Sequence, residues 1–561
     1  MIRAVARPPA AATDAPAPLR PWPWALVAVA VPTVAVGVHA LLYGRWIVDD
    51  AAITFAYARS IATGEGPVLQ PGAEPVEGYS NPAWLAVLVL GRWIGLFDRG
   101  AWFGVPDLVA FPKLLALGLV AGVFACCYAA ASALTRRPVL VTVLAGLVTA
   151  AVPSFVIWTV SGLENALLAF AAAGLAAVLV RAVAAGRLYA PSTPVWCGLL
   201  AALAALTRPD GLVYVAAFPL VVLLLLRRAD LARAVRSVVL GVLVFAVPVG
   251  AYLAWRLATF GEYLPNTAIA KSQGLPGVAA ALRPAELIGY AGWPAALLAV
   301  AAIGAVVTRP GHRALVALLV PLALAVLAFG VLEPDWMGQL RFATPVWPLA
   351  ALAGMTAAVV VAPVLSMRAR VVGAVLAVGA ALVSGLALVD SARAFRAAPT
   401  APLCLVAQNT GNAINAYADV VDVPDAVLLA PDIGGAALVS GLRVVDVAGL
   451  ADRRIARFWG NGDMAGLRDH VFEDVRPTFL TLNSDWARLT GLLDDPRLAA
   501  DYVEIRTSTA GLTDRVRRDV LEPGDLEALR DRASAAAAAD DAARRSPRAS
   551  CGDVLVPPPG R

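Results

Sequence analysis

The 20 residues from Trp24 to Tyr43 read WALVAVAVPTVAVGVHALLY and contain no Asp, Glu, Lys or Arg. A helix rises about 1.5 Å per residue, so a stretch of this length crosses the roughly 30 Å hydrocarbon core of a bilayer. Arg3, Arg7 and Arg20 precede it, and it is too long and too poorly delimited for a cleaved signal peptide. We therefore expect an uncleaved first membrane span with a cytoplasmic N-terminus.

The composition of the whole chain agrees with this first stretch. The 561 residues are 60% hydrophobic and 15% charged, and their mean hydropathy is +0.73. Such a chain is too apolar for a water-soluble domain, so an all-α, multi-pass transmembrane bundle is predicted. The net charge of +5 is spread over short joints between apolar stretches, as in cytoplasmic loops, and we exclude nucleic-acid binding.

Apolar stretches of spanning length predict about eleven crossings before residue 390. They run from Trp22 to Tyr43, Leu108 to Leu134, Val139 to Trp158, Ala166 to Val183, Val195 to Leu206, Gly211 to Leu226, Val238 to Ala258, Leu287 to Val307, Ala314 to Val331, Ala343 to Leu365 and Val371 to Val389. With the N-terminus inside, the basic pairs of the joints fall on the cytoplasmic side and nearly all acidic, motif-like residues fall outside. Ala83 to Phe97 is then a re-entrant or surface-lying segment.

Asp, Arg, Asn and Gly replace the long apolar runs after Val389, which predicts a small α/β domain outside the cytoplasm. Buried strands are expected from Ala426 to Asp432, ending at Gly434-Gly435, from Leu442 to Val447 and from Thr478 to Leu482. The predicted organisation is a cytoplasmic tail (1–21), a transmembrane domain (22–390) with a first outer loop (44–107), the α/β domain (391–521) and a flexible tail (522–561).

The cysteines give no sign of a metal centre, because no CxxC pair or His cluster accompanies them. Cys126, Cys127 and Cys197 lie in apolar stretches as small hydrophobic residues. Cys404 and Cys551 both follow the last predicted span. They form either a disulfide outside the cytoplasm or two free thiols.

The first outer loop carries the clearest chemical signal. Asp49 and Asp50 follow the first span directly, and Ile53, Tyr57 and Ile61 recur at helical spacing, which predicts a helix lying on the membrane surface. A carboxylate at this depth can take a proton from a hydroxyl acceptor or stabilise positive charge on a sugar ring. The alternative for one of the pair is that it caps this same surface helix by accepting backbone N–H bonds.

Three further acidic positions have both a functional and a structural interpretation. Glu77 lies in a turn-rich outer loop, where it is either a second site carboxylate or a solvated residue. Glu164 follows Gly162-Leu163 at the outer end of a span, where an ionisable group is functional or paired. Asp335 beside Trp336 suits a sugar ring, although Trp336 also fits an interfacial aromatic belt.

Several motifs taken together resemble the GT-C glycosyltransferases that include the terminal arabinofuranosyltransferases of the mycobacterial cell wall. They are Asp49 to Thr54 followed by Val76 to Pro82, Trp158 to Glu164, Leu206 to Gly211, Tyr263 to Lys271, and Asp335 to Met337 before Arg341-Phe342, with a looser match from Asp432 to Asp452. The resemblance implies a decaprenyl-phosphate sugar donor, transfer on the outer face and a catalytic aspartate in the first loop. It also places Tyr79, Asn81 and Asn266 among the substrate-binding residues.

A polyprenyl phosphate needs cationic partners while its sugar departs. Lys271, then Arg341, then Arg208 are the candidates, against the alternative of basic side chains that reach to water or lipid headgroups. One Asp pair does not make a closed ligand set, so neither a metal nor another cofactor is assigned.

The sequence thus favours an enzyme of the plasma membrane whose partners are the bilayer, a polyprenyl-phosphate sugar and a cell-envelope polysaccharide. A transporter or lipid flippase is the main alternative, but no pair of related halves is visible in the sequence. A non-catalytic envelope scaffold is the third hypothesis.

Overall fold

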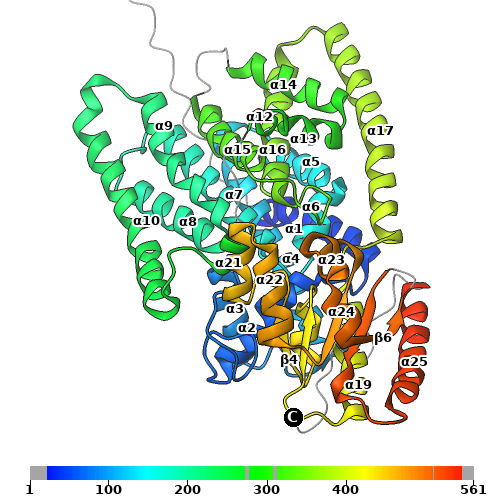
Figure 1. The fold of residues 1–561 in the computed structure, drawn as a ribbon. Coiled ribbons are helices and arrows are strands. Elements are labelled where there is room, and N and C mark those ends of the chain that lie inside the picture. The colour runs from blue at the N-terminus through cyan, green and yellow to red at the C-terminus, as the bar shows by residue number, and fades with distance from the viewer. Residues whose placement is uncertain (1–21, 272–276, 308–312, 509–510, 546–561) are drawn as a thin grey trace, which may run out of the picture.

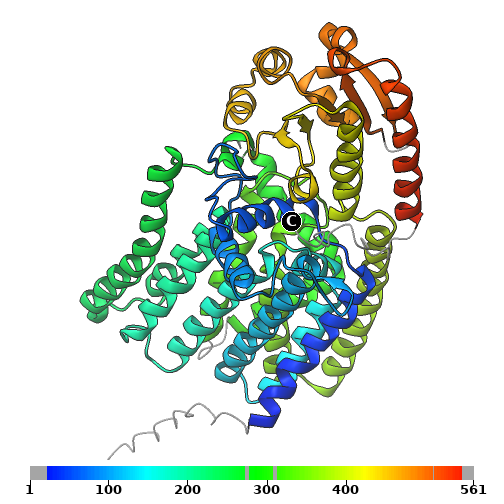
Figure 2. The same ribbon diagram turned by 90° about the horizontal axis from the view of Figure 1, so that it is seen from below.

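The computed structural model describes residues 22–271, 277–307, 313–508 and 511–545. The chain forms a helical bundle and a small α/β domain that covers one end of the bundle (Figures 1 and 2). Figure 2 shows the first helix and most of the bundle extending away from the α/β domain, which is drawn in yellow to red. The two parts meet around the segment that follows the first helix.

The described residues contain seven helical segments long and apolar enough to cross a membrane. They are 23–43 (α1, Trp22–Ala40, with η1, Leu41–Tyr43), α4 (Asp107–Leu134), α7 (Asn165–Ala184), 228–260 (η3, Arg228–Asp230, with α10, Leu231–Phe260), α15 (Arg313–Val331), 346–364 (α16, Val346–Val361, with η5, Ala362–Val364) and α17 (Met367–Ala397). Large apolar side chains such as Val247 on α10 and Leu386 on α17 are exposed, as expected for surfaces that face lipid.

Two bent pairs could add two spans. They are α5 (Pro138–Ala151) with α6 (Pro153–Thr159), bent by 81°, and the segment from Ala280 to Ala291 with α14 (Trp293–Val307), bent by 108°. The first bend falls where Pro153 starts a new helix. The structure thus describes seven to nine spans, and the predicted eleven are not confirmed.

The difference in span count arises at two short predicted spans, Val195 to Leu206 and Gly211 to Leu226. They correspond to α8 (Ser192–Thr207) and to η2 (Pro209–Ala216) with α9 (Ala217–Leu225), which are shorter apolar segments separated by Arg208. Arg208 has extended backbone dihedrals and precedes a proline, so the α-helix ends there. Remaining short helices of the bundle are α11 (Asn266–Lys271), α12 (Val278–Leu282), α13 (Pro284–Ala291) and η4 (Arg341–Ala343).

The first outer loop contains two helices, α2 (Asp49–Ala62) and α3 (Pro82–Trp93), and a two-stranded hairpin of β1 (Ala101–Trp102) and β2 (Val105–Pro106). The helix predicted from the Ile53 and Tyr57 spacing is present, but its apolar face is covered by protein and not by lipid. Ile53 is 5% exposed and Tyr57 is fully buried. Helix α2 is enclosed because α3 of the same loop packs on one side of it and α20 (Gly434–Val439) of the α/β domain packs on it as well.

The α/β domain has a five-stranded sheet in the order β4-β3-β5-β7-β6. Strands β3 (Val427–Ala430), β4 (Arg443–Asp446) and β5 (Phe479–Leu482) confirm the three predicted strands, and β3 pairs in parallel with both neighbours. The antiparallel strands β6 (Tyr502–Thr507) and β7 (Thr513–Arg517) were not predicted. The helical segments of the α/β domain are α18 (Leu403–Val406), η6 (Ala407–Asn412), α19 (Ala413–Val421), α20, α21 (Arg453–Asn461), α22 (Met464–Asp469), η7 (His470–Val475), α23 (Ser484–Thr490), η8 (Leu492–Asp494), α24 (Pro496–Asp501) and η9 (Arg518–Val520).

The expectation of a flexible tail from residue 522 onward is wrong for its first half. Residues 525–545 form α25 (Asp525–Arg545), which packs on α19 and β6. Leu529 and Ala533 are buried on that face, so apolar burial at helical spacing holds a segment whose composition looked disordered. Cys551, named with Cys404 in the predicted disulfide or pair of free thiols, lies outside the described residues.

Candidate active site

Asp49 and Asp50 begin α2 but differ in their surroundings. The Asp49 side chain is buried, and its carboxylate accepts hydrogen bonds from the backbone N–H groups of Gly434 (2.9 Å) and Gly435 (2.7 Å). These two residues start α20, so Asp49 caps a helix of the α/β domain. The predicted alternative, that one of the pair caps the helix they begin, is wrong: the N-cap of α2 is Val48, and Asp49 caps a helix 385 residues further along the chain.

This cap requires the two glycines. A Cβ atom on Gly434 would lie 2.0 Å from the Asp49 backbone oxygen, and one on Gly435 would lie 2.4 Å from the backbone nitrogen of Ala407. Both distances are far inside van der Waals contact, and both involve backbone atoms that cannot easily move. The Gly434-Gly435 pair thus lets α20 approach α2 closely enough for Asp49 to reach its N–H groups.

Asp50 is turned by about 100° around the helix axis from Asp49 and is partly exposed. No described residue forms a hydrogen bond or ion pair with its carboxylate. Burial raises the pKa of Asp50, the charges of Lys271 and Arg341 oppose this rise, and those of Asp335 and Glu164 add to it. The result is a carboxylate with a raised pKa and without a fixed partner, which suits a group that takes up a proton.

Arg341 is held by an ion pair and by a strained turn. Its Nε lies 2.6 Å from a carboxylate oxygen of Asp335. The preceding residues Gln339 and Leu340 have φ angles of 50° and 47°, in the left-handed region that non-glycine residues rarely adopt. The Gln339 carbonyl accepts from Trp158 Nε1 (3.1 Å) and its side-chain oxygen accepts from the Tyr290 hydroxyl (2.6 Å). These bonds hold the turn that presents Arg341.

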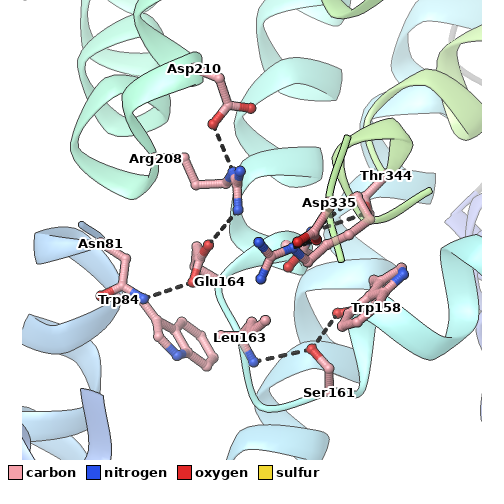
Figure 3. Close-up of polar contacts among 12 residues, drawn as sticks. Asn81, Trp84, Trp158, Ser161, Leu163, Glu164, Arg208, Asp210, Asp335 and Thr344 are labelled. Atoms are coloured by element: carbon pink, nitrogen blue, oxygen red, sulfur yellow. Dashed lines mark hydrogen bonds and ion pairs between the residues drawn. The ribbon is translucent and has the colours of Figure 1, made fainter. Parts of the chain in front are cut away.

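Glu164 and Arg208 belong to a chain of polar contacts that joins three helices (Figure 3). The Asn81 amide donates to Glu164 (2.7 Å), and Arg208 donates to Glu164 and to Asp210 (2.8 Å each). The Arg208 guanidinium also lies 4.7 Å from the centroid of the Phe342 ring. Because Glu164 and Arg208 are both buried and paired, this chain sets the relative positions of the first loop, α7 and η2.

Glu77 forms a second buried ion pair, with Arg256 of α10. Its carboxylate lies 2.5 Å from Arg256 Nε and also accepts from Nη2 (3.0 Å) and from the Tyr252 hydroxyl. The Glu77 carbonyl accepts from the backbone N–H of Asn266 (3.1 Å). Tyr79 is buried nearby, with its ring 5.0 Å from that of Tyr57. Glu77 thus joins the first loop to α10 and α11, and a substrate-binding role for Glu77 and Tyr79 remains a prediction.

We expect Glu77→Gln to destabilise the protein by about 3 kcal/mol, because it leaves the buried Arg256 charge without a counter-charge. Thermal unfolding in detergent should show a clear loss of stability. The matched control is Glu74→Gln, since Glu74 has a 65% exposed side chain and a 3.6 Å contact to Arg453. Exposed pairs contribute little, so the control should change stability by less than about 1 kcal/mol. Equal effects of both substitutions would contradict the assigned role of Glu77.

The last three predicted site residues are Asn266, Lys271 and Trp336. The buried Asn266 side chain donates to the carbonyl oxygens of Gly449, Leu450 and Asp452, so it joins α11 to the α/β domain. Lys271 ends α11 and is exposed, and Trp336 is 61% exposed. No ion pair within the described residues involves Lys271.

The structure gathers part of the predicted set around Asp50. Lys271, Arg341, Asp335 and Glu164 all act electrostatically on this carboxylate, and Arg208 joins them through Glu164. Glu77 and Asn266 instead connect elements of the fold. Sequence reasoning missed Arg256 and Asp210 as partners. A charged residue inside an apolar stretch was a signal for Arg256, and the Arg208-Pro209-Asp210-Gly211 motif already contained Asp210.

The described residues contain no group of three or more His, Cys, Asp or Glu side chains placed to hold a metal ion. The cofactor expectation from the sequence stays a prediction.

Solved structures of membrane transferases share this fold. ArnT from Cupriavidus metallidurans, solved with bound undecaprenyl phosphate, aligns with a TM-score of 0.56 and 17% identity over 89% of this chain and 99% of its own. The oligosaccharyltransferase of Archaeoglobus fulgidus aligns with a TM-score of 0.54 and 11% identity over 89% of this chain and 75% of its own. The chain therefore has a GT-C type fold, which confirms the predicted fold class.

A curated sequence also resembles the chain. The terminal β-(1→2)-arabinofuranosyltransferase of Mycobacterium tuberculosis is 30% identical over 266 residues, which are 46% of this chain and 40% of that protein. The match thus spans less than half the length of this relative. It confirms the resemblance predicted from the motifs. No family model matches the chain.

Proposed function

We propose that this chain is a membrane glycosyltransferase that transfers arabinofuranose from a polyprenyl-phosphate donor to a cell-envelope glycan. One observation carries the proposal: the Asp50 carboxylate, which has no hydrogen-bond or ion-pair partner among the described residues, lies within electrostatic reach of the cations Lys271 and Arg341. The fold supports it, because ArnT has this fold and was solved with undecaprenyl phosphate bound. The sugar rests on the named activity of the mycobacterial relative.

In the proposed reaction the donor phosphate lies against Lys271 and Arg341, and the acceptor hydroxyl faces Asp50. The hydroxyl oxygen forms a bond to the anomeric carbon while the bond from that carbon to the phosphate oxygen breaks. The electron pair of the broken bond leaves with the phosphate, and the hydroxyl proton passes to the Asp50 carboxylate. Cations beside the phosphate stabilise the negative charge that develops there, and burial of Asp50 raises its pKa towards that of a useful base.

The orientation of the protein in the membrane and an exposed aromatic ring bear on where transfer occurs and how the acceptor binds. The enzyme would lie in the plasma membrane with its N-terminus in the cytoplasm and its α/β domain outside, as the charge distribution along the sequence predicts. Transfer would then occur on the outer face. The exposed Trp336 ring, one residue from the Asp335 that holds Arg341, offers a flat surface for a sugar of the acceptor.

Lys271→Met should raise the KM for the donor by about tenfold or more, because it removes a charge-assisted contact to phosphate. The KM for the acceptor should stay within about twofold of that of the wild type. The matched control is Arg457→Met, since Arg457 is an exposed cation on α21 that pairs with Glu262. An unchanged donor KM in Lys271→Met would remove Lys271 from the phosphate site.

The activity is tested with purified protein in detergent and a panel of radiolabelled donors. The panel contains decaprenyl-phosphate arabinofuranose, the same lipid with mannose or galactofuranose, and a nucleotide sugar, each offered with an arabinan oligosaccharide. We expect transfer from decaprenyl-phosphate arabinofuranose and none from the nucleotide sugar. Transfer from only one of the other lipid-linked sugars would show that the donor sugar is not arabinofuranose. Absence of transfer from every lipid-linked sugar would favour a transporter, a flippase or a scaffold.

A further inference from the structure

The α/β domain brings a charged side chain of its own to Asp50. Strand β3 ends at Ala430, and the chain passes through Pro431 and Asp432 before α20 begins at Gly434. Strand β3 lies in the middle of a parallel trio, between β4 and β5. Ligands of open α/β sheets bind beyond the carboxyl ends of such strands, which is the position of Asp432.

The cap on α20 fixes where Asp432 lies relative to the bundle. Gly434 donates to Asp49 at 2.9 Å, and a Cβ atom on Gly434 would lie 2.0 Å from the Asp49 carbonyl oxygen and 3.0 Å from the Ala52 side chain. Asp432 precedes Gly434 by two residues, and Asp50 follows Asp49 directly. The closely packed contact between α2 and α20 therefore places Asp432 next to Asp50, although the two are far apart in the sequence.

The Asp432 carboxylate is partly buried, and no described residue forms a hydrogen bond or ion pair with it. Other acidic residues of this domain that are buried are satisfied: Asp446 accepts from two backbone N–H groups, and Asp514 pairs with Arg506. An unpaired carboxylate in a partly buried position is costly for folding alone. Because the Asp432 carboxylate lies beside Asp50, a ligand bound there can supply the hydrogen bonds that it lacks.

The charges around the two carboxylates differ. Lys271 and Arg341 act on Asp50, whereas Asp432 lies among carboxylates: the Asp50 charge acts on Asp432, and the Asp432 charge acts on Asp49. Burial and the Asp50 charge raise the pKa of Asp432 to about 6. A phosphate is attracted to the cations and repelled by an acidic neighbour. The side of Asp50 that faces Asp432 is thus suited to a neutral polyhydroxyl ligand.

We propose that Asp432 is an acceptor-binding residue, through which the α/β domain accepts hydrogen bonds from hydroxyl groups of the glycan acceptor beside Asp50. This inference rests on the proposed glycosyltransferase function and names the residue that selects the acceptor. A carboxylate binds sugar hydroxyls well because it is acceptor-only and can receive several O–H donors. The domain then contributes directly to the active site.

The test compares Asp432→Asn and Asp432→Ala in the full-length protein. The control is Asp419→Asn, an exposed acidic residue on α19 of the same domain. Initial rates are measured with decaprenyl-phosphate arabinofuranose and an arabinan oligosaccharide, varying each in turn, together with donor hydrolysis when water is the acceptor. Thermal unfolding and gel filtration verify that each variant is folded.

We expect Asp432→Ala to raise the acceptor KM by about tenfold or more, the loss typical of a hydrogen bond to a charged group. The donor KM and donor hydrolysis should change by less than about twofold, and Asp432→Asn should lie between wild type and Asp432→Ala. An unchanged acceptor KM in a folded variant would overturn the inference. So would equal losses towards donor and acceptor, because they would indicate a role in the fold. Wild-type protein without transfer from any lipid-linked sugar would instead overturn the proposed function.

Discussion

Asp50→Asn is expected to lower kcat for sugar transfer by about 10²- to 10⁴-fold, the contribution typical of a general base. Asn has nearly the same shape as Asp but cannot take up the acceptor proton. The KM for the donor should rise by no more than a few-fold, because Lys271 and Arg341 remain in place. The measurement is steady-state transfer of radiolabelled sugar in detergent, with protein of verified fold.

The pH dependence gives an independent check on Asp50. Burial raises the pKa of its carboxylate, and the base works only when it is deprotonated. The wild-type kcat should therefore be full at high pH and fall as the pH is lowered through this raised pKa, at a higher pH than an ordinary aspartate would show. A wild-type profile that stays flat down to pH 4 would contradict the assignment of Asp50 as base.

Asp49→Ala is expected to destabilise the contact between the bundle and the α/β domain by about 3 to 5 kcal/mol. The change removes two hydrogen bonds and leaves the buried N–H groups of Gly434 and Gly435 without an acceptor. Thermal unfolding should shift to lower temperature, and amide exchange should increase in 434–439. Transfer should decrease as well, because the α/β domain then holds its position less firmly.

Asp49→Asn is the matched variant for this effect. Its amide retains one acceptor oxygen, so it should lose less stability than Asp49→Ala. Substitutions at the two neighbouring aspartates should thus have different effects. Asp50→Asn should abolish catalysis with little loss of stability, whereas the main effect of Asp49→Ala should be a loss of stability. A stable Asp49→Ala with abolished kcat would reverse the roles assigned to the pair.

Local patterns were sufficient for much of the fold. The apolar stretches predicted the long helices, the spacing of Ile53 and Tyr57 predicted α2, and the run before Gly434-Gly435 predicted β3. Strand β7 was missed because its sequence, Thr-Asp-Arg-Val-Arg, looks solvated. Its Asp514 is in fact buried and pairs with Arg506 of β6 at 2.9 Å. A charge that is neutralised by a distant partner cannot be recognised from its own segment.

The candidate site shows the same limit. The sequence named the Asp pair, Lys271 and Arg341 as candidates, but adjacent aspartates look alike until their partners are known. The N–H groups at the start of α20, 385 residues further along the chain, bind Asp49, whereas no residue in the described part of the chain pairs with Asp50. The sequence left Glu77 as either a site carboxylate or a solvated loop residue, whereas Arg256 of α10 neutralises it in a buried ion pair. Long-range pairing of this kind depends on how the helices pack, so it cannot be predicted from local composition.

The most direct test of the central claim is single-turnover transfer from decaprenyl-phosphate arabinofuranose to an arabinan oligosaccharide, with wild type, Asp50→Asn and Asp49→Asn side by side. We expect labelled product from the wild type, product from Asp49→Asn in proportion to its folded fraction, and at least about 10²-fold slower formation with folded Asp50→Asn. Equal rates for wild type and Asp50→Asn would contradict it, as would a wild type that transfers no lipid-linked sugar.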